Sequence, residues 1–191
     1  MRAFCFLIGA LLAAVPVVAA AAPAVAEYPH AVDSFAASCL SGDLTAQARL
    51  AAASTNGWRE TDAAGLKVAG LGVGKAIDKN YNFDRPEAVT VFEQDIDAHP
   101  ARLIVATFPA KNRYRTLCAL VMRDVANAFV YKDELGDAFK ALGIKGKSVD
   151  LPHYFEWAGK VGSDNVPVRG EVFTRSQALG GKRDMHIYVA F

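Results

Sequence analysis

The first 26 residues place one positive charge ahead of a long apolar stretch, and this pattern constrains the rest of the chain most strongly. Arg2 carries the charge, and Ala24-Val25-Ala26 supplies the small residues that a signal peptidase accepts. We therefore expect residues 1–26 to be a signal peptide that is cleaved after Ala26. The protein would then be periplasmic or secreted.

Two alternatives for this segment fit less well. About 20 apolar residues are enough to span a bilayer, but Pro16 and Pro23 weaken the helix and no basic residues follow to stop transfer. Cys5 cannot be the lipidated first residue of a lipoprotein, because most of the apolar run follows it. We therefore expect membrane contact only through the uncleaved signal segment.

The composition predicts one globular domain over residues 27–191. Of the 191 residues, 52% are hydrophobic and 21% are charged, which is too apolar for a disordered chain. The formal net charge is +1, and removal of Arg2 leaves equal numbers of acidic and basic residues. Such a chain has no basic field for binding nucleic acid, so we expect no nucleic-acid partner.

Cleavage would leave two cysteines, Cys39 and Cys118. In an exported protein such a pair is more often a disulfide than two thiols. We therefore predict a Cys39–Cys118 bridge, with two buried thiols or an intermolecular bridge as the alternatives. A bridge would also exclude both sulfur atoms as catalytic nucleophiles.

Two helices are predicted at the start of the mature chain. Apolar residues at helical spacing indicate one helix over residues 30–40, with Cys39 on its buried face. A second helix is expected to be capped by Asp43 and to end at Asn56-Gly57, a pair that tolerates left-handed backbone. Trp58 follows and is expected to fill the junction.

The remaining chain predicts six strands and a third helix. This helix is expected to be capped by Asp133 and stopped by Gly143. A turn at Gly180-Gly181 is expected to join the last two strands. The strands are predicted at 88–96, 103–108, 114–121, 153–160, 168–176 and 184–191.

The order of these elements predicts an α+β domain. We expect a single antiparallel sheet of about six strands, with two N-terminal helices and one helix between the third and fourth strands. The helices would pack on one face of the sheet. Leu103–Phe108 is apolar on both sides, which favours a central strand covered on both faces or a strand hidden at an edge.

Two glycine-containing stretches approach a phosphate-binding loop without matching it. Gly70–Ala76 lacks the first glycine and the final hydroxyl residue of a P-loop, and Gly146-Lys147-Ser148 follows a predicted helix instead of a strand. We interpret both as turns. No cofactor and no cofactor-binding residue is expected.

Asp95, Asp97 and His99 alternate, so a strand would align them on one face as a metal or acid–base cluster requires. Asp97 to Pro100 is also typical of a turn. A solvated hairpin tip is therefore the favoured interpretation, and no metal ligand is assigned.

The strand predicted at 153–160 carries the best local candidates for chemistry. His153, Phe155 and Trp157 share one face, while Glu156 lies on the other. We expect Phe155 and Trp157 in the core and Glu156 in solvent. The enzymatic alternative is an exported hydrolase with a site around His153, Glu156 and Arg169, although no catalytic motif supports it and no catalytic residue is assigned.

A less favoured alternative is a small outer-membrane β-barrel. The C-terminal residues Met185, Ile187, Val189 and Phe191 alternate and end on an aromatic side chain, as in the last strand of such barrels. The predicted helices and the strand that is apolar on both sides argue against it.

The pattern Phe35-x-x-x-Cys39, followed by an Ala-rich helix that ends at Asn56-Gly57-Trp58, resembles uncharacterised small exported proteins of proteobacteria. The resemblance implies an envelope location and carries no activity. The favoured function is therefore a non-enzymatic binding module of the cell envelope, with a small molecule or an envelope protein as its partner.

Overall fold

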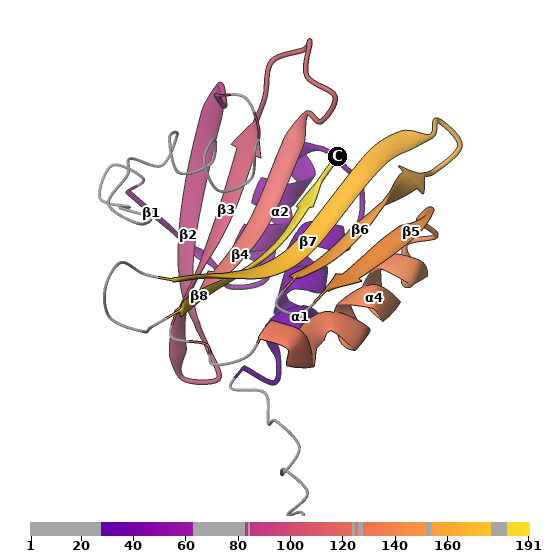
Figure 1. Cartoon of the computed structure of the whole chain (residues 1–191). Helices are drawn as coiled ribbons and strands as arrows, with labels where there is room; N and C mark the ends of the chain where they lie inside the picture. The colour runs from indigo at the N-terminus through magenta and orange to yellow at the C-terminus, as the bar shows by residue number, and fades with distance from the viewer. Residues whose placement is uncertain are drawn as a thin grey trace, which may run out of the picture.

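Eight strands in the described part of the chain form one antiparallel sheet (Figure 1). The computed structural model describes residues 28–62, 83, 85–123, 125, 128–151, 154–176 and 183–191. The strands are β1 (Arg59–Thr61), β2 (Ala88–Ile96), β3 (His99–Thr107), β4 (Thr116–Met122), β5 (Lys145–Leu151), β6 (Tyr154–Val161), β7 (Val166–Ser176) and β8 (Arg183–Ala190). Their order across the sheet is β1-β2-β3-β4-β8-β7-β6-β5. Two runs of consecutive strands therefore meet where β4 pairs with the C-terminal strand.

The predicted α+β class and antiparallel pairing are confirmed, but the sheet has two more strands than expected. Both additions, β1 and β5, lie at its edges. Gly146-Lys147-Ser148, predicted as a turn, belongs to β5, so that prediction is wrong. An edge strand needs backbone bonds to only one neighbour, here β6, and can therefore form without an apolar alternation. The predicted turn at Gly180-Gly181 lies outside the described residues.

The first predicted helix is confirmed as α1 (Ala31–Phe35) running directly into a π-helical turn, η1 (Ala36–Leu40). The second, α2 (Ala46–Thr55), begins later than predicted. Its cap is Thr45, whose hydroxyl accepts the backbone N–H of Ala48 at 3.2 Å. Asp43 is not the cap, because its carbonyl lies in the preceding loop and accepts a hydrogen bond from the Arg49 guanidinium.

The third helix, α4 (Lys132–Ala141), follows a 3₁₀ turn, η3 (Ala128–Tyr131). Because this turn continues into the helix at Tyr131, Asp133 lies inside the first turn and is not the cap that the sequence predicts. Its charge is still favourable there, near the positive end of the helix dipole. Gly143 ends the helix with a φ of 70°, as expected. No helix among the described residues has the length and apolarity needed to cross a membrane.

The three α-helices of the described residues, α1, α2 and α4, pack on one face of the sheet, which we call the first face. Side chains from α1, η1, α2 and α4 form one core with alternate residues of the strands, among them Leu103, Leu120 and Ile187. Phe139 of α4 lies against Gly170 of β7, where an added Cβ would overlap three atoms of the ring. Glycine at this strand position therefore allows the helix to approach the sheet closely.

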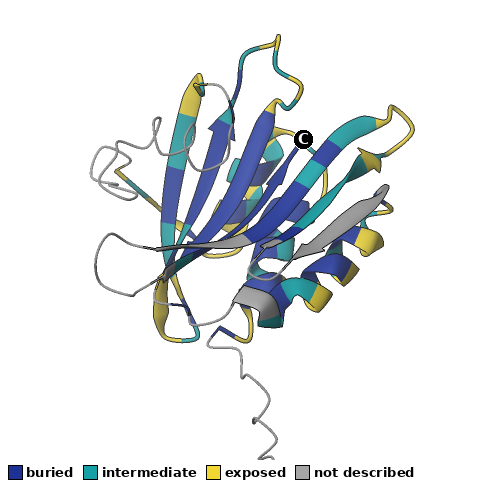
Figure 2. Cartoon of the chain, viewed as in Figure 1, coloured by how far each residue is buried: buried dark blue, intermediate teal, exposed yellow. Residues whose placement is uncertain are grey.

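The opposite side of the sheet, the second face, also carries a core. Ile104 and Ala106 of β3 pack with Leu117 and Ala119 of β4. Phe83 completes this cluster through ring contacts with neighbouring aromatic residues at centroid distances between 5.3 and 6.0 Å. Figure 2 shows the central strands β3 and β4 in the colour of buried residues. The prediction of a central strand covered on both faces at Leu103–Phe108 is thus confirmed.

A disulfide joins Cys39 of η1 to Cys118 of β4, as predicted. The two Cα atoms lie 5.5 Å apart and the cysteines are separated by 79 positions in sequence. Trp58 fills the adjacent junction, since it is buried and its indole N–H donates to the Ser38 hydroxyl at 3.0 Å. The first helical segment is therefore fixed to the centre of the sheet both covalently and by packing.

Candidate binding cleft

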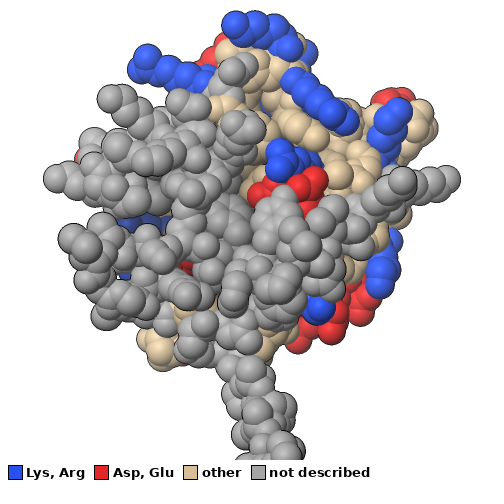
Figure 3. All heavy atoms as spheres, in the orientation of Figure 1, with Lys and Arg blue, Asp and Glu red and all other residues tan. Residues whose placement is uncertain are grey.

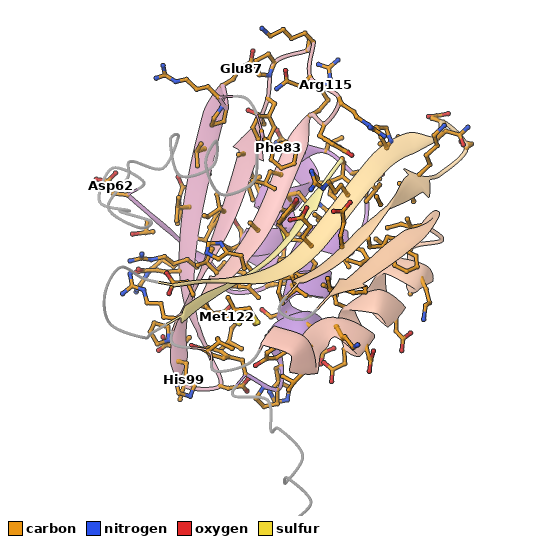
Figure 4. All side chains as sticks on the ribbon, viewed as in Figure 1. Asp62, Phe83, Glu87, His99, Arg115 and Met122 are labelled. Atoms are coloured by element: carbon orange, nitrogen blue, oxygen red, sulfur yellow. A yellow bond between two sulfur atoms is a disulfide. The ribbon has the colours of Figure 1, made fainter. Side chains whose placement is uncertain are left out.

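A cleft of about 260 Å³ lies on the second face of the sheet. Its lining comes from β1, β2, β3, the end of β4 and the start of β8. Figure 4 labels His99 and Met122, which mark this end of the sheet, and Arg115, which marks the other end. The charged residues of the lining are Arg59, Arg102, Arg123, Glu93, Asp95 and Asp184.

Strand register brings three of these residues side by side. Arg59 of β1 lies opposite Glu93 of β2, and Glu93 lies opposite Arg102 of β3. Because side chains alternate along a strand, Ala101 and Leu103 point into the first-face core while Arg102 points to the second face. The charged residue in this largely apolar strand therefore lines the cleft.

On the side of β1 and β2, the cleft is lined by an ion pair. An Nη2 atom of Arg59 lies 2.6 Å from Oε1 of Glu93. Both side chains are exposed, so the pair adds little to the free energy of folding. Its consequence is local, because it neutralises the carboxylate that faces Arg102 across the strands.

Arg102 is half-buried on the floor of the cleft, beside Pro100 and Val121. Burial lowers the pKa of its guanidinium and the charge of Arg123 lowers it further, whereas Glu93 and Asp184 act in the opposite direction. The guanidinium stays protonated. Within the described residues Arg102 makes no side-chain hydrogen bond and no ion pair. No other residue that the structure describes therefore uses its donors.

The hairpin tip at Asp97 is confirmed, but Asp97 is not simply solvated. Asp97 and Ala98 form the turn between β2 and β3, with φ angles of 52° and 63°. One carboxylate oxygen of Asp97 lies 2.5 Å from Nδ1 of His30, and the other accepts the His30 backbone N–H at 3.0 Å. This pair joins the start of α1 to the hairpin.

The three residues of the predicted hairpin-tip cluster separate in the structure. Asp95 lines the cleft, Asp97 faces His30, and the ring of His99 lies 5.0 Å from that of Tyr28. No group of three possible metal ligands occurs among the residues that the structure describes. The partner of Asp97 is distant in sequence, so no local pattern could have identified it.

The candidate hydrolase residues are only partly brought together. Glu156 and Arg169 lie 3.4 Å apart, and the same Arg169 nitrogen also pairs with Glu171, which sequence reasoning missed. Glu156 is half-buried and ion-paired, so its expected place in solvent is wrong. Phe155 is in the core, and Trp157 is half-buried and packs against it. His153 and Gly70–Ala76 lie outside the described residues.

Comparisons of the chain with protein-family models, with curated proteins and with solved structures gave no match.

Proposed function

We propose that the protein is an exported, non-enzymatic binding module of the cell envelope, periplasmic or secreted, whose small-molecule ligand occupies the cleft. The observation that carries the proposal is the cleft of about 260 Å³ with six charged side chains in its lining. Small ligands bind in concave sites, where polar groups that face one space fix the orientation of the ligand. Export is supported by the signal-peptide pattern and by the Cys39–Cys118 disulfide, a bond that persists in oxidising compartments.

The central strands give this cleft a rigid floor. β4 is buried along its whole length, and β3 is buried on both faces from Leu103 to Ala106, next to Arg102. The disulfide attaches β4 to η1 on the other side of the sheet. Rigid support lowers the conformational entropy lost on binding, which suits a site that must hold a small ligand.

The hydrolase alternative has one observation in its favour. Glu156 and Glu171 face each other on β6 and β7, and a facing pair of carboxylates is what many hydrolases of glycosidic bonds use. However, a single Arg169 nitrogen contacts both carboxylates, so both are held in ion pairs with the same guanidinium. We therefore place the ligand in the cleft and interpret these three residues as a structural charge cluster.

The proposal is tested by native mass spectrometry on the protein purified from its own cell envelope. Pro100 is exposed and lines the cleft, so Pro100→Trp fills the cleft without entering the core. We expect the wild-type protein to carry a discrete added mass and Pro100→Trp to have lost it.

Pro109→Trp is the matched control, since Pro109 follows β3 at the opposite end of the sheet and does not line the cleft. It should retain the added mass. Equal retention in both variants would place the ligand elsewhere, and a wild-type protein with no added mass, together with no binding of any small molecule offered, would contradict the proposal. An added mass of protein size would indicate an envelope protein as the partner.

A further inference from the structure

Two arginines of the cleft lack an ion pair within the described part of the chain. Arg59 pairs with Glu93, whereas neither Arg102 nor Arg123 has a carboxylate within ion-pair distance among the described residues. Arg102 is half-buried and Arg123 is exposed directly after β4. The two positive charges are close enough to repel each other.

The register of β3 and β4 places Arg102 and Arg123 near each other. Arg102 lies opposite Val121 in the β3–β4 register, and Arg123 follows two positions later, on the same face of the sheet. Glu93 and Asp184 act favourably on Arg102 from the two sides but do not form an ion pair with it in the described structure. An anion between Arg102 and Arg123 would remove their repulsion and use the N–H groups of both guanidinium forks.

We infer that the ligand of the cleft is a small organic acid or phosphate whose anionic group is held between Arg102 and Arg123. This inference rests on the proposed function, since it concerns the same cleft. The volume of about 260 Å³ suits a small molecule, and Val121 and Pro100 offer an apolar surface to its body. Arg59–Glu93 and Asp95 would border the ligand on the β1–β2 side.

Isothermal titration calorimetry with inorganic phosphate and with citrate tests the inference, and the two probes separate phosphate from carboxylate recognition. We expect at least one to bind the wild-type protein and to bind more weakly as salt is added. Arg102→Gln should weaken binding by about tenfold or more, and Arg123→Gln by less because that side chain is more exposed.

Arg115→Gln is the matched control for the loss of one arginine charge. The loop between β3 and β4 carries Lys111, Arg113 and Arg115, and Figure 3 shows basic side chains gathered at that upper end of the molecule. Arg115 is exposed and remote from the cleft (Figure 4). If anions bound to any exposed cation, Arg115→Gln would weaken binding as much as Arg102→Gln, and the inference would fail.

The remaining outcomes separate this inference from the proposed function. If neither anion binds, and native mass spectrometry finds a neutral or cationic small molecule that Pro100→Trp loses, the cleft is the site but its ligand is not an acid. If no small molecule of any class binds, both are wrong. Near-ultraviolet circular dichroism of Arg102→Gln and Arg123→Gln shows whether a loss of binding reflects a loss of folding.

Discussion

The side chains of β3 point alternately to the two faces of the sheet, and their surroundings differ between the two faces. On the first face, Ala101, Leu103 and Val105 are all buried under the helices. On the second face, Ile104 and Ala106 are buried, but Arg102 lines the cleft. The first face is thus apolar and buried from Ala101 to Val105, while the second changes from core to cleft within two residues.

This difference shows how a sheet can hold a site without losing its core. The first face provides continuous packing against the helices and the covalent link through Cys118. The second face can therefore carry charged side chains at one end, where packing contributes less to the free energy of folding. We expect substitutions on the first face to change stability and those in the cleft to change binding.

The largest effect is expected from the disulfide on the first face. Replacing Cys39 and Cys118 together by serine should lower the free energy of unfolding by about 4 kcal/mol, because the bridge closes a long loop in the unfolded chain. Urea denaturation under oxidising conditions measures this loss. An unchanged midpoint would contradict the bridge, and the wild-type protein treated with a reductant should resemble the double variant.

The sharpest comparison uses two positions on the second face of β3. Ile104→Ala should lower the free energy of unfolding by about 2 to 5 kcal/mol, because Ile104 is fully buried between strands. Arg102→Ala should change it by less than about 0.5 kcal/mol, since Arg102 makes no ion pair within the described residues. Equal losses in chemical denaturation would show that Arg102 is part of the core and would remove the distinction between the two ends of this face.

A smaller effect is expected at Gly170. An alanine there would place its Cβ against the ring of Phe139, and overpacking of this kind costs about 1 to 3 kcal/mol. Gly136→Ala is the control, because its Cβ would lie 3.8 Å from Phe155, which is ordinary contact, and alanine favours the helix. If thermal unfolding gives the same change for both variants, α4 does not approach the sheet as closely as described.

The smallest effect concerns pH at the hairpin beside the cleft. The hydrogen bond to Asp97 raises the pKa of His30, and the charge of Asp97 adds to it. Burial acts to raise the pKa of Asp97, but the hydrogen bonds from His30 outweigh it and lower that pKa. The ion pair therefore makes its full contribution to the stability of the folded protein between pH 3.8 and pH 6.5. These limits are the pKa values of the carboxyl and the imidazole in the unfolded chain.

This contribution is lost as the pH rises through the raised pKa of His30 or falls through the lowered pKa of Asp97. Comparing wild-type and His30→Gln stability at about pH 5 and about pH 8 measures it, and the difference should shrink at the higher value. Asp97→Asn should have the same effect, and the double variant no more. A difference that does not change with pH would show that the pair is not formed in solution.

Much of the fold could be predicted because its signals are local. The helix over residues 31–40, the strand over 88–96 and the left-handed Gly57 after α2 all follow from short patterns of apolar and turn residues. The bridge could be predicted because the expected cleavage after Ala26 would leave two cysteines, Cys39 and Cys118. β5 could not, because the sheet edge it occupies requires no apolar alternation.

The cleft could not be predicted, because its parts are distant in sequence. The pairing of Arg59 with Glu93 and of Glu93 with Arg102 depends on the registers of β1, β2 and β3. One local signal was present, since Arg102 interrupts an otherwise apolar run between Ala101 and Leu103. A predicted strand that began at Leu103 left Arg102 out, and Asp95, which also lines the cleft, was interpreted as part of a solvated hairpin tip.

The most direct test of the central claim is a two-dimensional ¹H–¹⁵N NMR titration of the protein with citrate and with phosphate. We predict shifts in the backbone amides of Glu93 to Asp95 and of Arg102, and in the side-chain Nε–H of Arg102. The amides of Lys111 to Arg115, in the basic loop at the other end of the sheet, should stay unchanged. Shifts confined to that loop, or equal shifts at both ends, would contradict a binding site in the cleft.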